Sequence, residues 1–145
     1  MKRITSILVA VFILATVFSF IGTQEDPWKV PEKYEKMKNP VLADDASIKA
    51  GKELYSEHCV NCHGKKGKGD GYKAENINTT PTDFTTAAFQ KQSDGSLLYK
   101  ISYGHKDMPG FKKRIPDNAD VIEGTFGKTR SPGDLINYLR TFGKK

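Results

Sequence analysis

The only two cysteines of the chain lie in one short run, residues 59–63, which reads Cys-Val-Asn-Cys-His. A Cys-x-x-Cys-His run is typical of covalent c-type haem attachment. Two thiols at this spacing can add to the two vinyl groups on one edge of a porphyrin, and the histidine that follows can bind the iron. We therefore predict that Cys59 and Cys62 form thioether links and that His63 is the proximal iron ligand. No second run of this kind occurs, so one haem c is expected.

In an exported protein two cysteines ordinarily form a disulfide, but the Cys-x-x-Cys-His run overturns that default here. Two other uses of the cysteine pair remain open. A redox pair of thioredoxin type belongs beside a β-α-β pattern, and no run of β-branched residues follows the first apolar segment. A zinc site needs four ligands. His58 and His63 flank the cysteines too closely for all four to close on one tetrahedral metal, and His105 is the only other histidine.

Met108 is the candidate for the second axial position on the iron. It lies in a predicted loop after Gly104 and is followed by Pro109, which stiffens the backbone. A thioether ligand fills the iron's coordination sphere and raises the reduction potential, which suits electron transfer. The alternatives are His105, Met37 in the N-terminal region, and an open site. We expect the His105 side chain to be exposed, because it directly follows the end of a predicted helix.

The chain begins with the layout of an export signal. Lys2 and Arg3 precede an almost unbroken apolar run, residues 4–21. This run is long enough to span a membrane, and no Ala-x-Ala cleavage site follows it. We therefore predict a signal peptide or membrane anchor over residues 1–22. Both alternatives predict a periplasmic domain, either soluble or tethered to the inner membrane through residues 4–21.

Helices are the only regular elements that the remaining sequence predicts. Residues 23–46 form an arm punctuated by three prolines, and residues 47–145 form the haem domain. Ser47 is the expected cap of a helix that runs into Cys59. A second helix is expected over residues 93–103 and ends at Gly104.

The last helix has the clearest boundary signals. Ser131 is the predicted N-cap, Pro132 the first helical residue, and Asp134 the acidic residue of a capping box. Gly143 is the expected end of this helix. Because Gly51 has no side chain, we expect the C-terminal helix to cross the helix before the haem motif at Gly51.

The charge of the chain is mildly basic, with a formal net charge of +6. After residues 1–22, which hold two basic residues and no acid, 21 basic and 17 acidic residues remain, a net charge of +4. The basic residues form small clusters without the long aromatic-interleaved run expected of a nucleic-acid-binding protein. Two clusters flank the predicted haem loops, either as a docking face for an acidic redox partner or as ordinary solvated surface; they are Lys65, Lys66, Lys68 and Lys112, Lys113, Arg114.

From about residue 46 to residue 142, the chain resembles a class I, monohaem bacterial c-type cytochrome. The resemblance rests on six segments: residues 51–55 (GKELY), 59–64 (CVNCHG), 67–71 (GKGDG), 93–95 (SDG), 108–111 (MPGF) and 137–140 (NYLR). It implies an all-α fold, with helices packed around one covalently bound haem that keeps an exposed edge. By position, it implies that Cys59 and Cys62 are the thioether links and that His63 and Met108 are the axial ligands. Residues 115–130 depart from the family, because they are longer and more polar than expected there.

The resemblance and the motif together imply an electron-transfer protein and not an enzyme. The expected function is a single-electron carrier in a respiratory chain, between a quinol-oxidising complex and a terminal oxidase or reductase. The alternatives are a fixed subunit of a larger respiratory complex, a haem peroxidase and a haem sensor.

Overall fold

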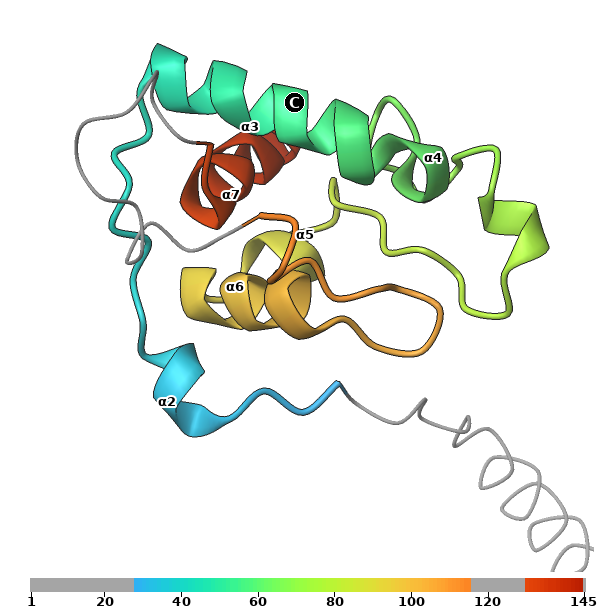
Figure 1. Ribbon diagram of the computed structural model, residues 1–145, viewed down its shortest axis with the longest axis horizontal. Coiled ribbons are helices and arrows are strands. Elements are labelled where there is room, and N and C mark those ends of the chain that lie inside the picture. Colours follow the sequence, from blue (N-terminus) through green and yellow to red (C-terminus); the bar gives the residue numbers. More distant parts are fainter. Residues whose placement is uncertain (1–27, 116–129, 145) are drawn as a thin grey trace, which may run out of the picture.

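The computed structural model describes residues 28–115 and 130–144 (Figure 1). The predicted signal or anchor, residues 1–22, lies outside this part of the chain, as does most of the polar stretch 115–130. The described residues form helices and loops, with no strand beyond an isolated bridge between His105 and Met108. The predicted all-α fold is confirmed.

The scaffold is a pair of crossed helices, α3 (Asp45–His58) and α7 (Pro132–Thr141) (Figure 1). They meet where Gly51 faces the backbone of Asp134, as the sequence predicts. A Cβ atom at Gly51 would lie 2.0 Å from the Asp134 carbonyl oxygen and 2.8 Å from the Cβ of Tyr138. Glycine is therefore required for the two backbones to approach this closely.

The start of α3 differs from the prediction. The N-cap is Asp44, whose side chain accepts a hydrogen bond from the Ser47 backbone N–H at 2.7 Å. Ser47 lies inside the first turn and is fully buried, where its hydroxyl oxygen accepts a bond from the Asn137 side chain. Ser47 therefore joins two helices instead of capping one, because its side chain faces α7.

The capping box predicted for α7 is present. The Ser131 hydroxyl accepts from the Asp134 N–H, and the Asp134 carboxylate accepts from the Ser131 N–H at 2.9 Å. Both residues are buried. Gly143 does not end the helical segment, because a 3-10 turn, η3 (Phe142–Lys144), follows α7 directly.

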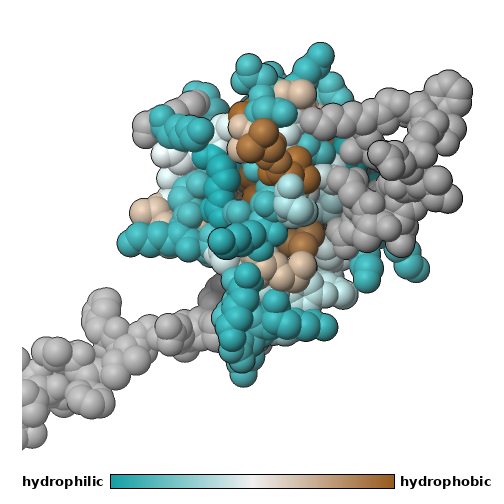
Figure 2. All heavy atoms as spheres, turned by 90° about the vertical axis from the view of Figure 1, so that its left-hand side faces the viewer, coloured by the Kyte–Doolittle hydropathy of each residue, from teal (hydrophilic) through white to brown (hydrophobic). Residues whose placement is uncertain are grey.

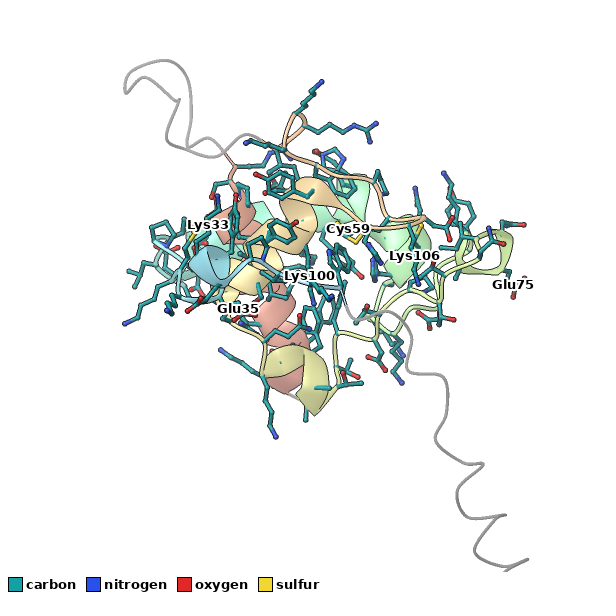
Figure 3. All side chains as sticks on the ribbon, turned by 90° about the horizontal axis from the view of Figure 1, so that it is seen from below. Lys33, Glu35, Cys59, Glu75, Lys100 and Lys106 are labelled. Atoms are coloured by element: carbon teal, nitrogen blue, oxygen red, sulfur yellow. The ribbon has the colours of Figure 1, made fainter. Side chains whose placement is uncertain are left out.

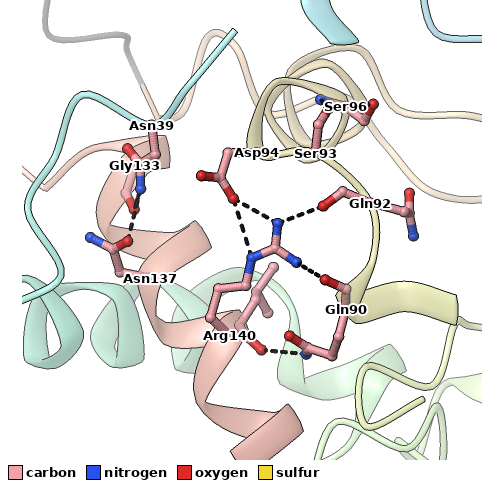
Figure 4. A network of polar contacts seen from close by, with 10 residues as sticks. Asn39, Gln90, Gln92, Ser93, Asp94, Ser96, Gly133, Asn137 and Arg140 are labelled. Atoms are coloured by element: carbon pink, nitrogen blue, oxygen red, sulfur yellow. Dashed lines mark hydrogen bonds and ion pairs between the residues drawn. The ribbon is translucent and has the colours of Figure 1, made fainter. Parts of the chain in front are cut away.

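A third helix, α6 (Asp94–Tyr103), packs against α7 after the short α5 (Ala87–Gln90), with Ser93 as N-cap and Gly104 after its end. Arg140 of α7 joins this helix to the start of α6 (Figure 4). Its guanidinium donates to the Asp94 carboxylate at 2.6 Å and to the backbone carbonyls of Gln90 and Gln92. Planar guanidinium geometry allows one side chain to hold all three acceptors.

The arm packs against the helical domain over its described part, residues 28–44. It contains one short helix, α2 (Glu32–Glu35). The Gly95 N–H of α6 donates to the Met37 carbonyl, and the Asn39 side chain donates to the Gly133 carbonyl and to Asn137 (Figure 4). On this side of the molecule apolar side chains gather at the centre of a hydrophilic surface (Figure 2).

The core lies between α3, α6 and α7, and Phe84 and Phe89 are both buried in it. None of the helices in residues 28–115 and 130–144 is long and apolar enough to cross a bilayer. The buried apolar side chains are Leu54, Tyr55, Phe84, Phe89, Leu97, Ile101, Phe111, Ile115, Leu135, Ile136, Leu139 and Phe142.

Candidate haem site

A cavity of about 350 Å³ lies beside the helical core. Its walls come from four parts of the chain: the junction of α3 with α4 (Val60–His63), the loop 79–82, the end of α6 with the loop 104–111, and the arm. Cys59, Cys62, His63 and Met108 all line it. The structure thus brings together every residue that the sequence predicts for the site.

Cys59 and Cys62 form no disulfide with each other, and both are half-buried on the cavity wall. Burial, with a smaller contribution from Cys62, raises the pKa of Cys59 to about 12. A raised pKa disfavours the thiolate that disulfide exchange requires, so Cys59 lacks the activated thiol of a thioredoxin-type redox site.

His63 is held in one orientation by the hydrogen bond that its Nδ1 atom makes with the Thr82 carbonyl oxygen at 3.1 Å. Because a carbonyl only accepts, Nδ1 carries the proton and a neutral ring leaves the Nε2 lone pair free. Burial lowers the pKa of His63, although the bond to Thr82 opposes this effect, so the ring is neutral near pH 7. The Phe84 ring stacks on His63 at 4.3 Å and 20°.

The backbone after His63 folds back beneath α4. Gly64 has φ 76°, and a Cβ atom there would lie 1.9 Å from the Asp70 carboxylate. Its carbonyl oxygen accepts a 2.7 Å bond from the buried Tyr55 hydroxyl. The glycine after the motif is therefore a steric requirement of the turn that fixes His63 against the core.

Met108 lies in a tight turn that returns the chain to α6. Its backbone exchanges two 2.9 Å hydrogen bonds with His105, across a turn in which Lys106 has φ 50°. The Phe111 N–H donates to the Ile101 carbonyl and closes the loop against α6. The Met108 side chain is half-buried against the apolar core and lines the cavity.

The expectation that His105 is exposed is wrong. Its ring is half-buried and stacks on Trp28 of the arm at 5.0 Å and 26°, and both residues line the cavity. Met37 is not at the site; its side chain is 43 % exposed and borders a different hollow, between the arm, α6 and α7.

Sequence reasoning missed two groups that contribute to the cavity. Lys100 of α6 lines it, although nothing in the sequence distinguishes this lysine from its neighbours. The Thr82 group that orients His63 is a backbone carbonyl. Every residue has such a group, so the sequence does not reveal which one contacts His63.

The donor set of the cavity fits a haem better than a zinc ion. In the part of the chain that the structure describes, no three His, Cys, Asp or Glu side chains are arranged to hold a metal. Both thiols and the His63 ring instead line one cavity together with Met108 and Phe111. The buried His105 Nε2 atom beside it has no hydrogen-bond partner among the described residues, as expected where a polar cofactor group is to be accommodated.

The chain is similar to chains of known structure. One solved structure with a similar chain is the reducing HAO-like protein complex of Kuenenia stuttgartiensis, at 25 % sequence identity and a TM-score of 0.58. The match covers 79 % of the present chain but 52 % of the other, so the present chain spans about half its length. No curated protein sequence matches.

The family comparison matches residues 46–121, which include the haem motif and the Met108 loop, to the family described as cytochrome c oxidase, cbb3-type, subunit III. The chain belongs to this cytochrome c family: it is an electron-transfer cytochrome that carries covalently bound haem c.

Proposed function

We propose that the protein is a single-electron carrier with one haem, attached through Cys59 and Cys62 and ligated by His63 and Met108. One observation carries the proposal: these four side chains, from two segments distant in sequence, line one cavity. The haem supplies the one-electron chemistry, and the chain supplies ligands, burial and orientation.

Two features of the ligands support electron transfer over catalysis. The bond from His63 to Thr82 leaves the Nε2 lone pair free for the iron, and such a bond fixes the orientation of a metal ligand. The Met108 loop is held by backbone bonds at both ends. A thioether there leaves no coordination position for substrate, which disfavours a peroxidase or sensor.

We place the carrier in a respiratory chain, between a quinol-oxidising complex and a terminal oxidase or reductase. Export through residues 1–22 would put it in the periplasm, either soluble or anchored to the inner membrane. The Kuenenia stuttgartiensis chain is part of a protein complex. This relationship supports the second candidate function, a fixed cytochrome subunit within a larger assembly.

The basic clusters support docking to an acidic redox partner. All six side chains are exposed; they are Lys65, Lys66, Lys68, Lys112, Lys113 and Arg114. Within residues 28–115 and 130–144, none of them lies within 4.0 Å of a carboxylate oxygen as an ion pair. Unpaired surface cations raise the rate of encounter with an acidic partner more than they raise affinity.

Haem attachment is tested on denaturing gels of protein matured in a c-type system. We expect a haem-stained band that acid-acetone extraction does not remove, and its loss when Cys59 and Cys62 are both changed to Ala. One mole of haem per mole of chain is expected. A wild-type band that disappears on extraction would refute covalent attachment.

The distal ligand is tested by comparing Met108→Ala with His105→Ala. The oxidised wild-type protein should show the weak far-red charge-transfer band of sulfur-ligated ferric haem. Met108→Ala should remove the band, lower the reduction potential and allow carbon monoxide to bind the reduced iron; His105→Ala should keep the band. The opposite pattern would establish bis-histidine ligation, and carbon monoxide binding by the wild type would favour a sensor or an enzyme.

Docking is tested by the ionic-strength dependence of electron transfer to an acidic partner protein. The rate should fall as salt rises, because the screening length is about 8–10 Å at moderate ionic strength. Changing Lys112, Lys113 and Arg114 together to Gln should reduce the low-salt rate and flatten the salt dependence. Equal rates at all salt concentrations for both proteins would assign the clusters to ordinary solvated surface.

A further inference from the structure

Lys100 is a half-buried cation that lines the cavity and has no anionic partner among the described residues. Its ammonium donates to the Gln92 side-chain oxygen at 2.5 Å and lies 5.3 Å from the centroid of the Trp28 ring. No Asp or Glu among the described residues forms an ion pair with it. Burial lowers the pKa of Lys100, as expected of an ammonium that has lost water without gaining an opposite charge. A bound anion would offset this desolvation.

Trp28 holds that ammonium in place. The Trp28 ring stacks on His105 on the loop that carries Met108, and it also contacts the Lys100 ammonium. A cation over a tryptophan face is stabilised by the ring quadrupole. Trp28 lies outside residues 46–121, the region that matches the cytochrome c family. The arm thus adds a wall to the cavity that the family region does not contain.

The position of this wall indicates which part of a haem it meets. The thiols lie at the α3–α4 junction, whereas the arm runs along the opposite side of the molecule, beyond α6 (Figure 1). Viewed from below, Lys100 lies toward the centre of the molecule, while Lys33 and Glu75 lie at its edges (Figure 3). A porphyrin attached through its vinyl edge carries its two propionate carboxylates on the opposite edge. Lys100 contacts Trp28 of the arm and therefore lies on the arm side of the cavity, whereas the thiols line it at the α3–α4 junction.

Building on the haem site proposed above, we propose that Lys100 binds a haem propionate and that Trp28 is the positioning residue that holds the Lys100 ammonium toward it. The arm is then part of the cofactor site and not only a tether. The ammonium neutralises a carboxylate close to the iron. Removing that positive charge stabilises the oxidised iron relative to the reduced iron, so the reduction potential falls.

The experiment uses the full-length, haem-loaded protein and begins with the haem-stained band. If the wild type carries no covalent haem, the proposed function fails and this inference fails with it. With haem present, the reduction potential and the propionate bending band in the resonance Raman spectrum are compared between variants. Lys100→Gln should lower the potential and shift the propionate band, and Lys100→Arg should restore both toward wild type.

Two further variants separate positioning from general packing. Trp28→Ala should shift the potential and the propionate band in the same direction as Lys100→Gln, whereas Trp28→Phe, which keeps an aromatic face, should shift them less. Lys112→Gln is the matched control, because Lys112 is exposed and lies 5.6 Å from the Tyr103 ring but does not line the cavity. It removes the same charge and should leave the propionate band unchanged.

One result overturns the inference while leaving the haem site intact. It is a Lys100→Gln protein with full haem content and with the potential and propionate band of the wild type. Equal shifts of the propionate band in Lys100→Gln and Lys112→Gln would also refute it, because a general surface-charge effect would then explain the data.

Discussion

Replacing Asn137 should loosen the arm from the helical domain. The Asn137 amide nitrogen lies within hydrogen-bond distance of the Val41 carbonyl at 3.1 Å, the Leu42 carbonyl at 3.2 Å and the Ser47 hydroxyl at 2.9 Å. Its oxygen accepts a bond from Asn39 at 2.8 Å. One buried side chain of α7 therefore joins two arm carbonyls, an arm amide and the first turn of α3.

The loss of stability expected for Asn137→Ala depends on which of its hydrogen-bond partners are buried. Asn137→Ala removes both donors and the acceptor, and Ser47, whose exposed fraction is 0 %, cannot replace the lost bond with water. Leaving a buried polar group unsatisfied costs about 1–3 kcal/mol. The arm carbonyls are nearer the surface and regain part of their bonding from water. We therefore expect a loss of about 2–3 kcal/mol, which corresponds to roughly 10–20 °C in Tm for a domain of this size.

The assay is thermal unfolding of the haem-loaded protein, followed by far-ultraviolet circular dichroism and by haem absorbance. Asn78→Ala is the control, because Asn78 is exposed and makes no side-chain hydrogen bond that the structure shows. Tryptophan fluorescence adds a local probe, since Trp28 is the only tryptophan and lies on the arm. A Tm within 3 °C or so of wild type for Asn137→Ala would refute the reasoning, because a loss of about 2 kcal/mol predicts a larger shift.

Two further substitutions test the packing of the scaffold. Gly51→Ala places a Cβ atom 2.0 Å from the Asp134 carbonyl oxygen, so the crossed helices must separate. We expect the free energy of unfolding, measured in urea, to fall by about 3 kcal/mol. Lys49→Ala, on the exposed side of the same helix, is the control and should lower it by less than about 0.5 kcal/mol. Arg140→Lys keeps the charge, but an ammonium cannot hold the three acceptors in one plane as the guanidinium does. The midpoint of urea unfolding should therefore fall by the equivalent of about 1–2 kcal/mol. A midpoint equal to that of the wild type would contradict this role of the Arg140 guanidinium.

The local elements of the fold were predictable because their signals are local. The capping box of α7 depends on two residues three positions apart, and Gly104 ends α6 with the positive φ that favours glycine. The crossing at Gly51 followed from one missing side chain. The haem motif could also be recognised from the sequence, because both thiols and His63 must lie within a single turn to reach one porphyrin.

The cap of α3 shows where local reasoning fails. Both Asp44 and Ser47 are good N-cap residues, and sequence preference does not choose between them. The choice is made by α7, because the Ser47 hydroxyl meets Asn137, which lies 90 positions further along the chain. A tertiary contact therefore moves the helix start by one turn.

The structure of the arm could be predicted only in part. Proline fixes φ and removes a backbone donor, and the described arm holds only one short helix, α2. Trp28 of the arm contacts both His105 and Lys100. The contacts could not be derived from sequence, because the residues that receive the arm belong to α6, α7 and the Met108 loop.

The error at His105 has a definite geometric cause. A residue just after a helix is ordinarily exposed, but His105 and Met108 form an antiparallel bridge and exchange both backbone hydrogen bonds. Side chains directly opposite one another across such a pair point to the same side of the ribbon. Once Met108 faces the cavity, His105 must face it too. The stack on Trp28 then gives the His105 ring a fixed role on the arm side of the cavity, which is why we assign the iron to the thioether and the arm contact to the imidazole.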